Sequence, residues 1–269
     1  MELLSIVVLG LVQGVTEWIP VSSKTQDTLV YLKLLNGDPS LVVPILLYLH
    51  IGTVLAALVY FRKEIRQIVA KAAEMPLGFS RHAQGKVGFL FTSMLFTGLV
   101  GVPLLLAEKK FFPFFDASVL FVLMGIGLLL TGVLLAKQSG SRLRNSSSAN
   151  WKDGVLTGLL QGLSVLPGVS RSGTSTTALI WRGFGGEDSF RLSFLLSIPT
   201  VVAAELVFYI GGGVFALPVS QGLALSASSF VFGFLTLDVV LKLARRINMA
   251  FVAFALGLVV LVAGLLGAG

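Results

Sequence analysis

The segment "QGVTEWIPVSSKTQD", residues 13 to 27, interrupts an apolar N-terminus with polar side chains and a single proline. A charged side chain in the middle of a bilayer costs about 2.5–3.5 kcal/mol on insertion scales, so it needs a partner there. The whole chain has 269 residues, of which 55% are hydrophobic and only 12% are charged. A soluble domain carries roughly 25% charged residues, so residues 13–27 belong to a membrane protein.

Long uncharged runs predict an all-α polytopic membrane protein. A spanning helix needs roughly 20 apolar residues, and uncharged runs of about this length lie at 87–106, 117–136, 219–237 and 249–269. The net charge of +7 indicates basic loops beside anionic lipid rather than a surface for nucleic acid. The chain has no cysteine, which excludes disulfides and thiolate chemistry.

Two blocks of sequence recur at a nearly constant spacing. The segment "GLVQGVT" at 10–16 matches "GLLQGLS" at 158–164, so that Gln13 falls on Gln161. With one residue deleted, Pro20 falls on Pro167 and Thr53 falls on Thr200. The pattern predicts two repeats, 1–136 and 154–269, which are joined by a polar cytoplasmic linker at 137–153.

Each repeat is expected to begin with a re-entrant helix–loop–helix and to continue with three transmembrane helices. The re-entrant hairpins are predicted at 3–35 and 154–181, because proline beside serine or glycine ends one helix and allows another to begin. The predicted spans are about 41–61, 87–106 and 117–136, then about 192–211, 219–241 and 249–268. Three spans are an odd number, so we expect an inverted-topology repeat with its site near the membrane midplane.

The distribution of positive charge predicts the orientation. Of the twenty Lys and Arg residues, fifteen lie in four loops, at 62–86, 137–153, 182–191 and 242–247. Loops rich in Lys and Arg stay in the cytoplasm. We therefore expect a multi-pass protein of the plasma membrane with both termini outside.

The second break, "PGVSRSGTS" at 167–175, combines one arginine with several hydroxyl groups. A helix that begins here directs its free N–H groups and the positive end of its dipole into the break. Together with Arg171, this pattern is typical of a phosphate site. The alternative is a serine-rich helix cap with an arginine that reaches the interface.

In the first break, Gln13 and Glu17 lie four residues apart, on one face of a helix. Arg171 is one candidate partner for Glu17, in an ion pair of purely structural importance or in a working site. A divalent cation, Mg²⁺ or Ca²⁺, is the other candidate, because Mg²⁺ binds one or two carboxylates together with substrate phosphates. His50, inside a predicted span, is interpreted as a packed, hydrogen-bonded histidine rather than a catalyst.

Four segments together resemble one family of membrane enzymes. They are "QGVTEWIPVSS" at 13–23, "LHIGTVLAALVYFRKEI" at 49–65, "PGVSRSGTS" at 167–175 and "FRLSFLLSIPTVVAAE" at 190–205. With them, nearly the whole chain resembles the undecaprenyl-diphosphate phosphatase (bacitracin-resistance) family. The resemblance implies an inverted repeat with two re-entrant hairpins and a site at the outer face. It also implies removal of the terminal phosphate of a C55-type polyprenyl diphosphate, which regenerates the carrier lipid for glycan assembly.

The candidate site residues come from two sources. By position, the resemblance implies Gln13, Glu17, Ser22, Ser23, Ser170, Arg171, Ser172 and Ser175, while Lys24, Thr174, Gln26 and Asp27 are added as their polar neighbours in the two breaks. The catalytic candidates are Glu17, Ser23 and Arg171, with Glu17 also the candidate metal ligand. The phosphate-binding candidates are Ser22, Lys24, Ser170, Ser172, Thr174 and Ser175. The supporting candidates are Gln13, Gln26 and Asp27.

The chain departs from the family just after Ser23. The family usually has a histidine at the place of Gln26, and glutamine does not transfer protons as histidine does. Either Lys24 holds phosphate charge while Asp27 or Glu17 supplies the base, or the site binds a polyprenyl phosphate without hydrolysis.

The predicted function is that of an integral membrane phosphatase acting on a polyprenyl diphosphate. The rival is a transporter or flippase for a polyprenyl phosphate, since inverted repeats are common in alternating-access carriers. A silent membrane scaffold is the third hypothesis, although it gives Arg171 no use. The expected partners are the polyprenyl diphosphate, membrane lipids and, as an open alternative, a second copy in a homodimer, but no nucleic acid.

Overall fold

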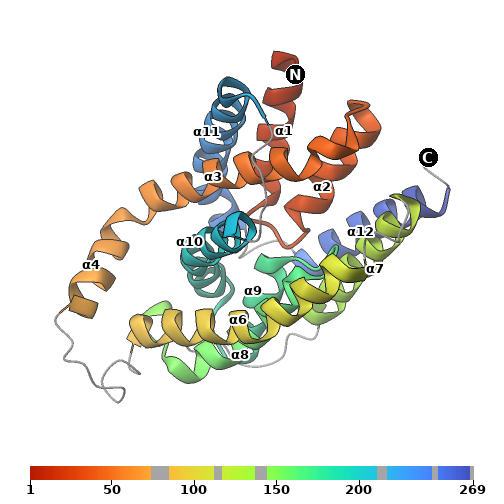
Figure 1. The fold of residues 1–269 in the computed structure, drawn as a ribbon. Helices are drawn as coiled ribbons and strands as arrows, with labels where there is room; N and C mark the ends of the chain where they lie inside the picture. Colours follow the sequence, from red (N-terminus) through yellow and green to blue (C-terminus); the bar gives the residue numbers. More distant parts are fainter. Residues whose placement is uncertain (74–84, 112–116, 137–143, 211–216, 244–247, 267–269) are drawn as a thin grey trace.

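The computed structural model describes residues 1–73, 85–111, 117–136, 144–210, 217–243 and 248–266. Within these ranges the chain is helical and contains no strand, apart from one isolated bridge between Arg144 and Phe184. Figure 1 shows the arrangement of the helices. The first group is α1 (Leu3–Thr16), α2 (Ser23–Leu29), α3 (Val42–Tyr60), α4 (Arg62–Ala73), α6 (Gly85–Phe111) and α7 (Ala117–Ala136). The second group is α8 (Trp151–Gly162), α9 (Arg171–Trp181), α10 (Gly186–Ile210), α11 (Val219–Leu243) and α12 (Met249–Leu265).

The protein is an all-α polytopic membrane protein. In the described part of the chain, five helices are long and apolar enough to cross a bilayer, namely α3, α6, α7, α10 and α11. The sixth predicted span, 249–268, corresponds to α12, a shorter apolar helix whose described part ends at Leu265. The six predicted spans therefore all correspond to apolar helices.

The structure differs from the predicted loops in three places, the first being the start of α8 at Trp151, inside the predicted linker 137–153. Residues 62–86 were expected to form a loop, but α4 occupies 62–73 because its apolar residues Ile65 and Ile68 pack against the core. The helix α10 begins at Gly186, six residues before the predicted span, with Glu187 and Asp188 in its first turn. Acidic side chains at a helix N-terminus stabilise it through the helix dipole, which favours the earlier start.

The first arm of each broken segment packs against a helix of the other half. The helix α1 lies on α11, and α8 lies on α6. A Cβ atom on Gly14 would lie 2.6 Å from the backbone nitrogen of Gly233, and one on Gly162 would lie 3.2 Å from that of Gly101. Glycine at these crossings allows the helix backbones to approach closely, as expected for small residues in membrane proteins.

Each half of the sequence repeat contains an equivalent hydrogen bond. In the first half, Gln13 Nε2 donates to Thr53 Oγ1 at 3.4 Å. In the second half, Gln161 Nε2 donates to Thr200 Oγ1 at 3.0 Å. Because these residues match in the sequence repeat, the paired bonds agree with a duplication, while the inverted insertion of the second half stays a prediction.

The two predicted breaks are breaks in the structure. Between α1 and α2, Ser22 has a φ of 56°, and between α8 and α9, Gly168 has a φ of 77°. Both values lie in the left-handed region, which ends regular helix. The breaks also touch, because Ser172 Oγ donates a hydrogen bond of 2.9 Å to the carbonyl oxygen of Ile19. The fold thus brings residues far apart in the sequence to one place.

Candidate active site

The helix α9 begins at the predicted phosphate loop. Ser170 is its N-cap, and the Ser170 Oγ accepts a hydrogen bond of 3.2 Å from the backbone nitrogen of Gly173. Such a cap satisfies one of the free N–H groups at the helix start. Arg171 is the first helical residue, so its guanidinium lies beside the positive end of the helix dipole.

Glu17 is the centre of the site, with donors on both of its oxygens. Arg171 Nη2 lies 2.8 Å from Glu17 Oε1. On the other oxygen, Oε2, Ser23 Oγ donates at 2.7 Å and Gln13 Nε2 donates at 3.2 Å. Residues of α1, α2 and α9 therefore converge on one carboxylate.

The Glu17–Arg171 ion pair answers the question about the partner of Glu17. The side chain of Arg171 is only 13% exposed and that of Glu17 is 7% exposed. Arg171 also donates to the backbone oxygen of Ser193, in α10, at 3.2 Å. The guanidinium is held inside the protein, so the alternative of an arginine that reaches the interface is wrong.

The residues around Glu17 do not fit a metal ion bound there. Its Oε1 accepts a hydrogen bond from Arg171, and its Oε2 accepts hydrogen bonds from Ser23 and Gln13. Within the described ranges, no three His, Asp or Glu side chains gather as metal ligands do.

The hydroxyl groups of the second break divide into two sets. Ser170 Oγ and Ser172 Oγ lie 3.1 Å apart, close to the first break. Thr174 Oγ1 instead donates to the backbone oxygen of Ser170 at 3.1 Å, and Ser175 Oγ to that of Arg171 at 2.8 Å. Thr174 and Ser175 thus satisfy the helix itself, while Ser170 and Ser172 lie where the breaks meet.

The residues of α2 and its N-cap face different surroundings. Ser22 Oγ accepts from Thr25 Oγ1 at 3.1 Å, Lys24 is exposed, and Gln26 Nε2 donates to the Val21 carbonyl at 3.1 Å. Asp27 is 1% exposed, and neither of its carboxyl oxygens has a hydrogen-bond partner among the described residues. A buried carboxyl without a partner is costly as an anion.

The structure brings His50 into the site. Its ring Nδ1 lies 2.6 Å from the backbone oxygen of Leu46, and its Nε2 lies 3.7 Å from Glu17 Oε2. His50 is therefore packed and hydrogen-bonded, as expected, but its position in the sequence did not indicate that Glu17 is its neighbour. The one available signal was Thr53, because it lies one helical turn from His50 and belongs to the repeated block.

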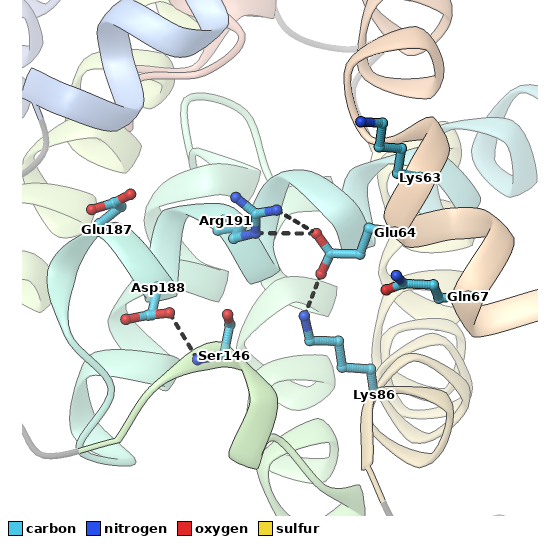
Figure 2. Close-up of a pocket in the computed structure, with 8 residues that line it drawn as sticks. All are labelled: Lys63, Glu64, Gln67, Lys86, Ser146, Glu187, Asp188 and Arg191. Atoms are coloured by element: carbon cyan, nitrogen blue, oxygen red, sulfur yellow. Dashed lines mark hydrogen bonds and ion pairs between the residues drawn. The ribbon is translucent and has the colours of Figure 1, made fainter. Parts of the chain in front are cut away.

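A separate polar cavity of about 560 Å³ lies away from these residues. Figure 2 shows it between α4, the start of α6 and the start of α10, with Glu64 at its centre. Glu64 accepts from Lys86 and, at 2.7 Å, from Arg191 Nη2. Asp188 accepts from the backbone nitrogen of Ser146 at 2.8 Å. The cavity is lined by acids and bases together, so it presents no excess charge to a phosphate.

The ion pairs of this cavity control the ionisation of Glu64. Burial raises the pKa of the Glu64 carboxyl, but the hydrogen bonds and charges of Lys86 and Arg191 outweigh burial and hold the pKa below its ordinary value. Glu64 is therefore an anion that ties α4 to α6 and α10.

Comparisons with known proteins agree on one family. The family described as "Bacitracin resistance protein BacA" matches residues 6–263. A protein of Methanothrix thermoacetophila named "Undecaprenyl-diphosphatase" is 34% identical over 97% of this chain and 96% of its own length. Proteins of the same name from Methanococcoides burtonii and Haloarcula marismortui are 36% and 35% identical, over 93% and 97% of this chain and 94% and 96% of their own lengths.

Proposed function

Since this chain belongs to the bacitracin resistance protein BacA family, we propose that it is a membrane phosphatase that hydrolyses undecaprenyl diphosphate. The products are the polyprenyl monophosphate and inorganic phosphate, which makes the protein a hydrolase of a phosphoric anhydride. The observation that carries this proposal at the level of residues is the ion pair between Glu17 and Arg171.

The pair suits an anionic substrate because it holds a guanidinium at the start of a helix. Arg171 stands in the first turn of α9, next to the hydroxyls of Ser170 and Ser172. Guanidinium, hydroxyls and helix N–H groups are the donors that bind phosphate oxygens. We assign Arg171, Ser170 and Ser172 to the diphosphate, with Lys24, which is exposed in α2, as a further source of positive charge.

Catalysis of phosphoryl transfer depends mostly on positioning and on stabilising charge in the transition state. Glu17 positions Arg171 through Oε1 and Ser23 through Oε2. Ser23 is therefore oriented either as the attacking hydroxyl or as a donor to the substrate, while a water molecule is the alternative nucleophile. Ser22, Thr174 and Ser175 are assigned to shaping the loops around the phosphates.

The polyprenyl tail belongs in the bilayer, along the apolar surface of the spans. We further propose that the protein lies in the plasma membrane, with its site open to the outer face and its termini outside. The excess of Lys and Arg in four loops supports this orientation.

The test is phosphate release from the purified protein in detergent with a polyprenyl diphosphate as substrate. We expect hydrolysis by the wild type and a loss of at least about 10²-fold in kcat/KM for Arg171→Ala, because it removes the charge that meets the transition state. The matched control is Arg62→Ala, which removes an exposed guanidinium at the start of α4. A parallel reaction with EDTA checks the divalent cation that the sequence predicts.

Two results would contradict the proposal in different ways. Lipid binding without phosphate release by the intact wild type would favour the rival transporter or flippase. Hydrolysis that survives both Arg171→Ala and Glu17→Ala would leave the enzyme in place and overturn the assignment of its site.

A further inference from the structure

The site lacks an obvious proton acceptor in α2. Gln26 stands where the family usually has a histidine, and its amide donates a hydrogen bond to the Val21 carbonyl at 3.1 Å. A carboxamide neither gains nor loses a proton near neutral pH, so Gln26 cannot act as a base. The reaction nevertheless releases a proton from the attacking oxygen, and a positioned base typically speeds such a step by about 10²- to 10⁴-fold.

The two acids near this position are poorly suited to accept that proton. Protonation of Glu17 would break its ion pair with Arg171 and its hydrogen bond from Ser23. Asp27 is 1% exposed and has no partner among the described residues to hold it as an anion. A general base must be free to take a proton and must be accessible to the attacking oxygen. Glu17 fails the first condition and Asp27 the second.

His50, in α3, is oriented as a base. Its Nδ1 lies 2.6 Å from the Leu46 carbonyl oxygen, a group that accepts hydrogen bonds only. In the neutral ring the proton therefore resides on Nδ1, which leaves the lone pair on Nε2. A hydrogen bond from one ring nitrogen to a backbone carbonyl is the usual way a histidine tautomer is fixed.

The unprotonated Nε2 of His50 faces the carboxylate of Glu17. His50 Nε2 lies 3.7 Å from Glu17 Oε2, and this oxygen also accepts from Ser23 Oγ at 2.7 Å. The base and the candidate hydroxyl thus meet at one oxygen atom, with Arg171 on the other oxygen of the same carboxylate. The ring is buried and 8% of His50 is exposed, which holds this orientation.

We propose that His50 is the proton acceptor of this enzyme. The inference rests on the proposed phosphatase function. As the oxygen of water bonds to the terminal phosphorus, His50 Nε2 takes one of its protons, and the bond from that phosphorus to the bridging oxygen breaks. The bridging oxygen leaves with its electron pair on the polyprenyl monophosphate. The second water proton stays on inorganic phosphate, and His50 then returns its proton to solvent.

Charged groups lie on every element around His50, but only some of them act on its ring. Glu17 of α1, Lys24 of α2 and Arg171 of α9 are within electrostatic reach of His50. Glu205 of α10 acts on Glu17, and Asp238 of α11 bonds to Tyr60 at the far end of α3. Changes at Lys24 are accordingly expected to move the pH profile, while changes at Asp238 are not.

The kinetic test compares His50→Gln and His50→Asn with the wild type across pH. Both amides can still donate to the Leu46 carbonyl, but neither can carry the proton. We expect kcat to fall by about 10²- to 10⁴-fold, KM to stay within about threefold, and the histidine limb of the kcat–pH profile to vanish. The matched control is His82→Gln, which removes the other histidine, at a position outside the described residues, and is expected to keep activity and limb.

A second measurement needs no activity. With only two histidines in the chain, ¹⁵N-histidine labelling of the His82→Gln protein gives NMR signals from His50 alone. We expect a protonated Nδ1, an unprotonated Nε2, and a shift of the Nε2 signal when a methylene-bridged polyprenyl diphosphonate binds.

The outcomes separate the inference from the proposed function. A wild type without phosphate release overturns the phosphatase itself. An active wild type whose His50→Gln variant keeps its kcat and pH limb overturns only the role of His50, as does a ring found with its proton on Nε2. If Asp27→Asn loses the limb while His50→Gln retains it, Asp27 is the acceptor instead.

Discussion

At the scale of single residues, the site depends on one carboxylate with two different oxygens. Glu17 Oε1 accepts from Arg171, whereas Glu17 Oε2 faces Ser23, Gln13 and His50. One oxygen of Glu17 thus holds the Arg171 guanidinium, and the other faces the Ser23 hydroxyl and the His50 ring. A substitution at Glu17 therefore disturbs both, while a substitution at a partner disturbs one.

The ion pair is expected to show strong coupling in a double-mutant cycle. Arg171→Gln leaves the buried Glu17 carboxylate uncompensated, so we expect the free energy of unfolding to fall by about 3–5 kcal/mol. The double variant Glu17→Gln, Arg171→Gln removes both charges and should lose less than the sum of the two single variants. The measurement is chemical unfolding in detergent micelles, and additive losses would show that the pair contributes nothing to stability.

At the scale of helices, small residues determine which surfaces meet. Gly14 in α1 lies against the backbone of Gly233 in α11, so any side chain there must displace a helix. Gly98 in α6 is different, because among the described residues no atom beyond its chain neighbours and the nearby backbone of its own helix lies within 4 Å of the place where its Cβ would be. Glycine is therefore required for helix packing at position 14 but not at position 98.

This contrast predicts the effect of larger residues at the two glycines. We expect Gly14→Leu to destabilise the protein by at least about 1–3 kcal/mol, the usual cost of forcing extra atoms into a packed region. Gly98→Leu is expected to leave the thermal unfolding midpoint in detergent unchanged. Equal losses in the two variants would contradict close packing between α1 and α11.

The Glu64 cluster between α4, α6 and α10 predicts a dependence on pH. Lys86 and Arg191 outweigh burial and lower the pKa of Glu64 in the folded state. The stabilisation is then present above the unfolded pKa, near 4.3, and is lost as pH falls through the lower folded pKa. The difference in unfolding free energy between wild type and Glu64→Gln should be constant near neutral pH and shrink below about pH 4.

A matched control separates this titration from general effects of acid. Gln67→Ala alters another side chain of the same cavity without removing an ionisable group. Its stability difference from the wild type should not vary with pH. A difference for Glu64→Gln that grows toward low pH would reverse the sign of the argument.

At the scale of the whole molecule, the two halves complete each other. The helix α1 packs on α11 and α8 packs on α6, and Glu17 of the first half pairs with Arg171 of the second. The apolar spans and the matched Gln–Thr hydrogen bonds belong to both halves alike. Neither half contains the site alone, so we expect separated halves to be inactive until they are expressed together.

The orientation in the membrane is testable because the chain has no cysteine of its own. Ser40 and Ser147 are both exposed, and the positive-charge distribution puts them on opposite sides of the bilayer. In intact cells we expect a membrane-impermeant maleimide to label Ser40→Cys and to label Ser147→Cys only after permeabilisation. The reverse pattern would place the termini inside and the site at the other face.

The sequence alone determined the class of the protein and its apolar helices. Hydropathy and proline positions are local properties, so the apolar helices and the breaks at Ser22 and Gly168 could be predicted. The helix α4 was not predicted, because Ile65 and Ile68 stabilise it by packing against a core that the sequence does not reveal.

The tertiary structure decided which of the polar residues meet. The polarity of residues 13–27 required a partner, but one sequence could not say whether Arg171 or a cation supplied it, because that depends on how α1 approaches α9. It also could not bring His50 to Glu17, since a histidine in an apolar helix looks the same whichever side it faces. Distances between separate helices are set by packing, and packing is a property of the whole fold.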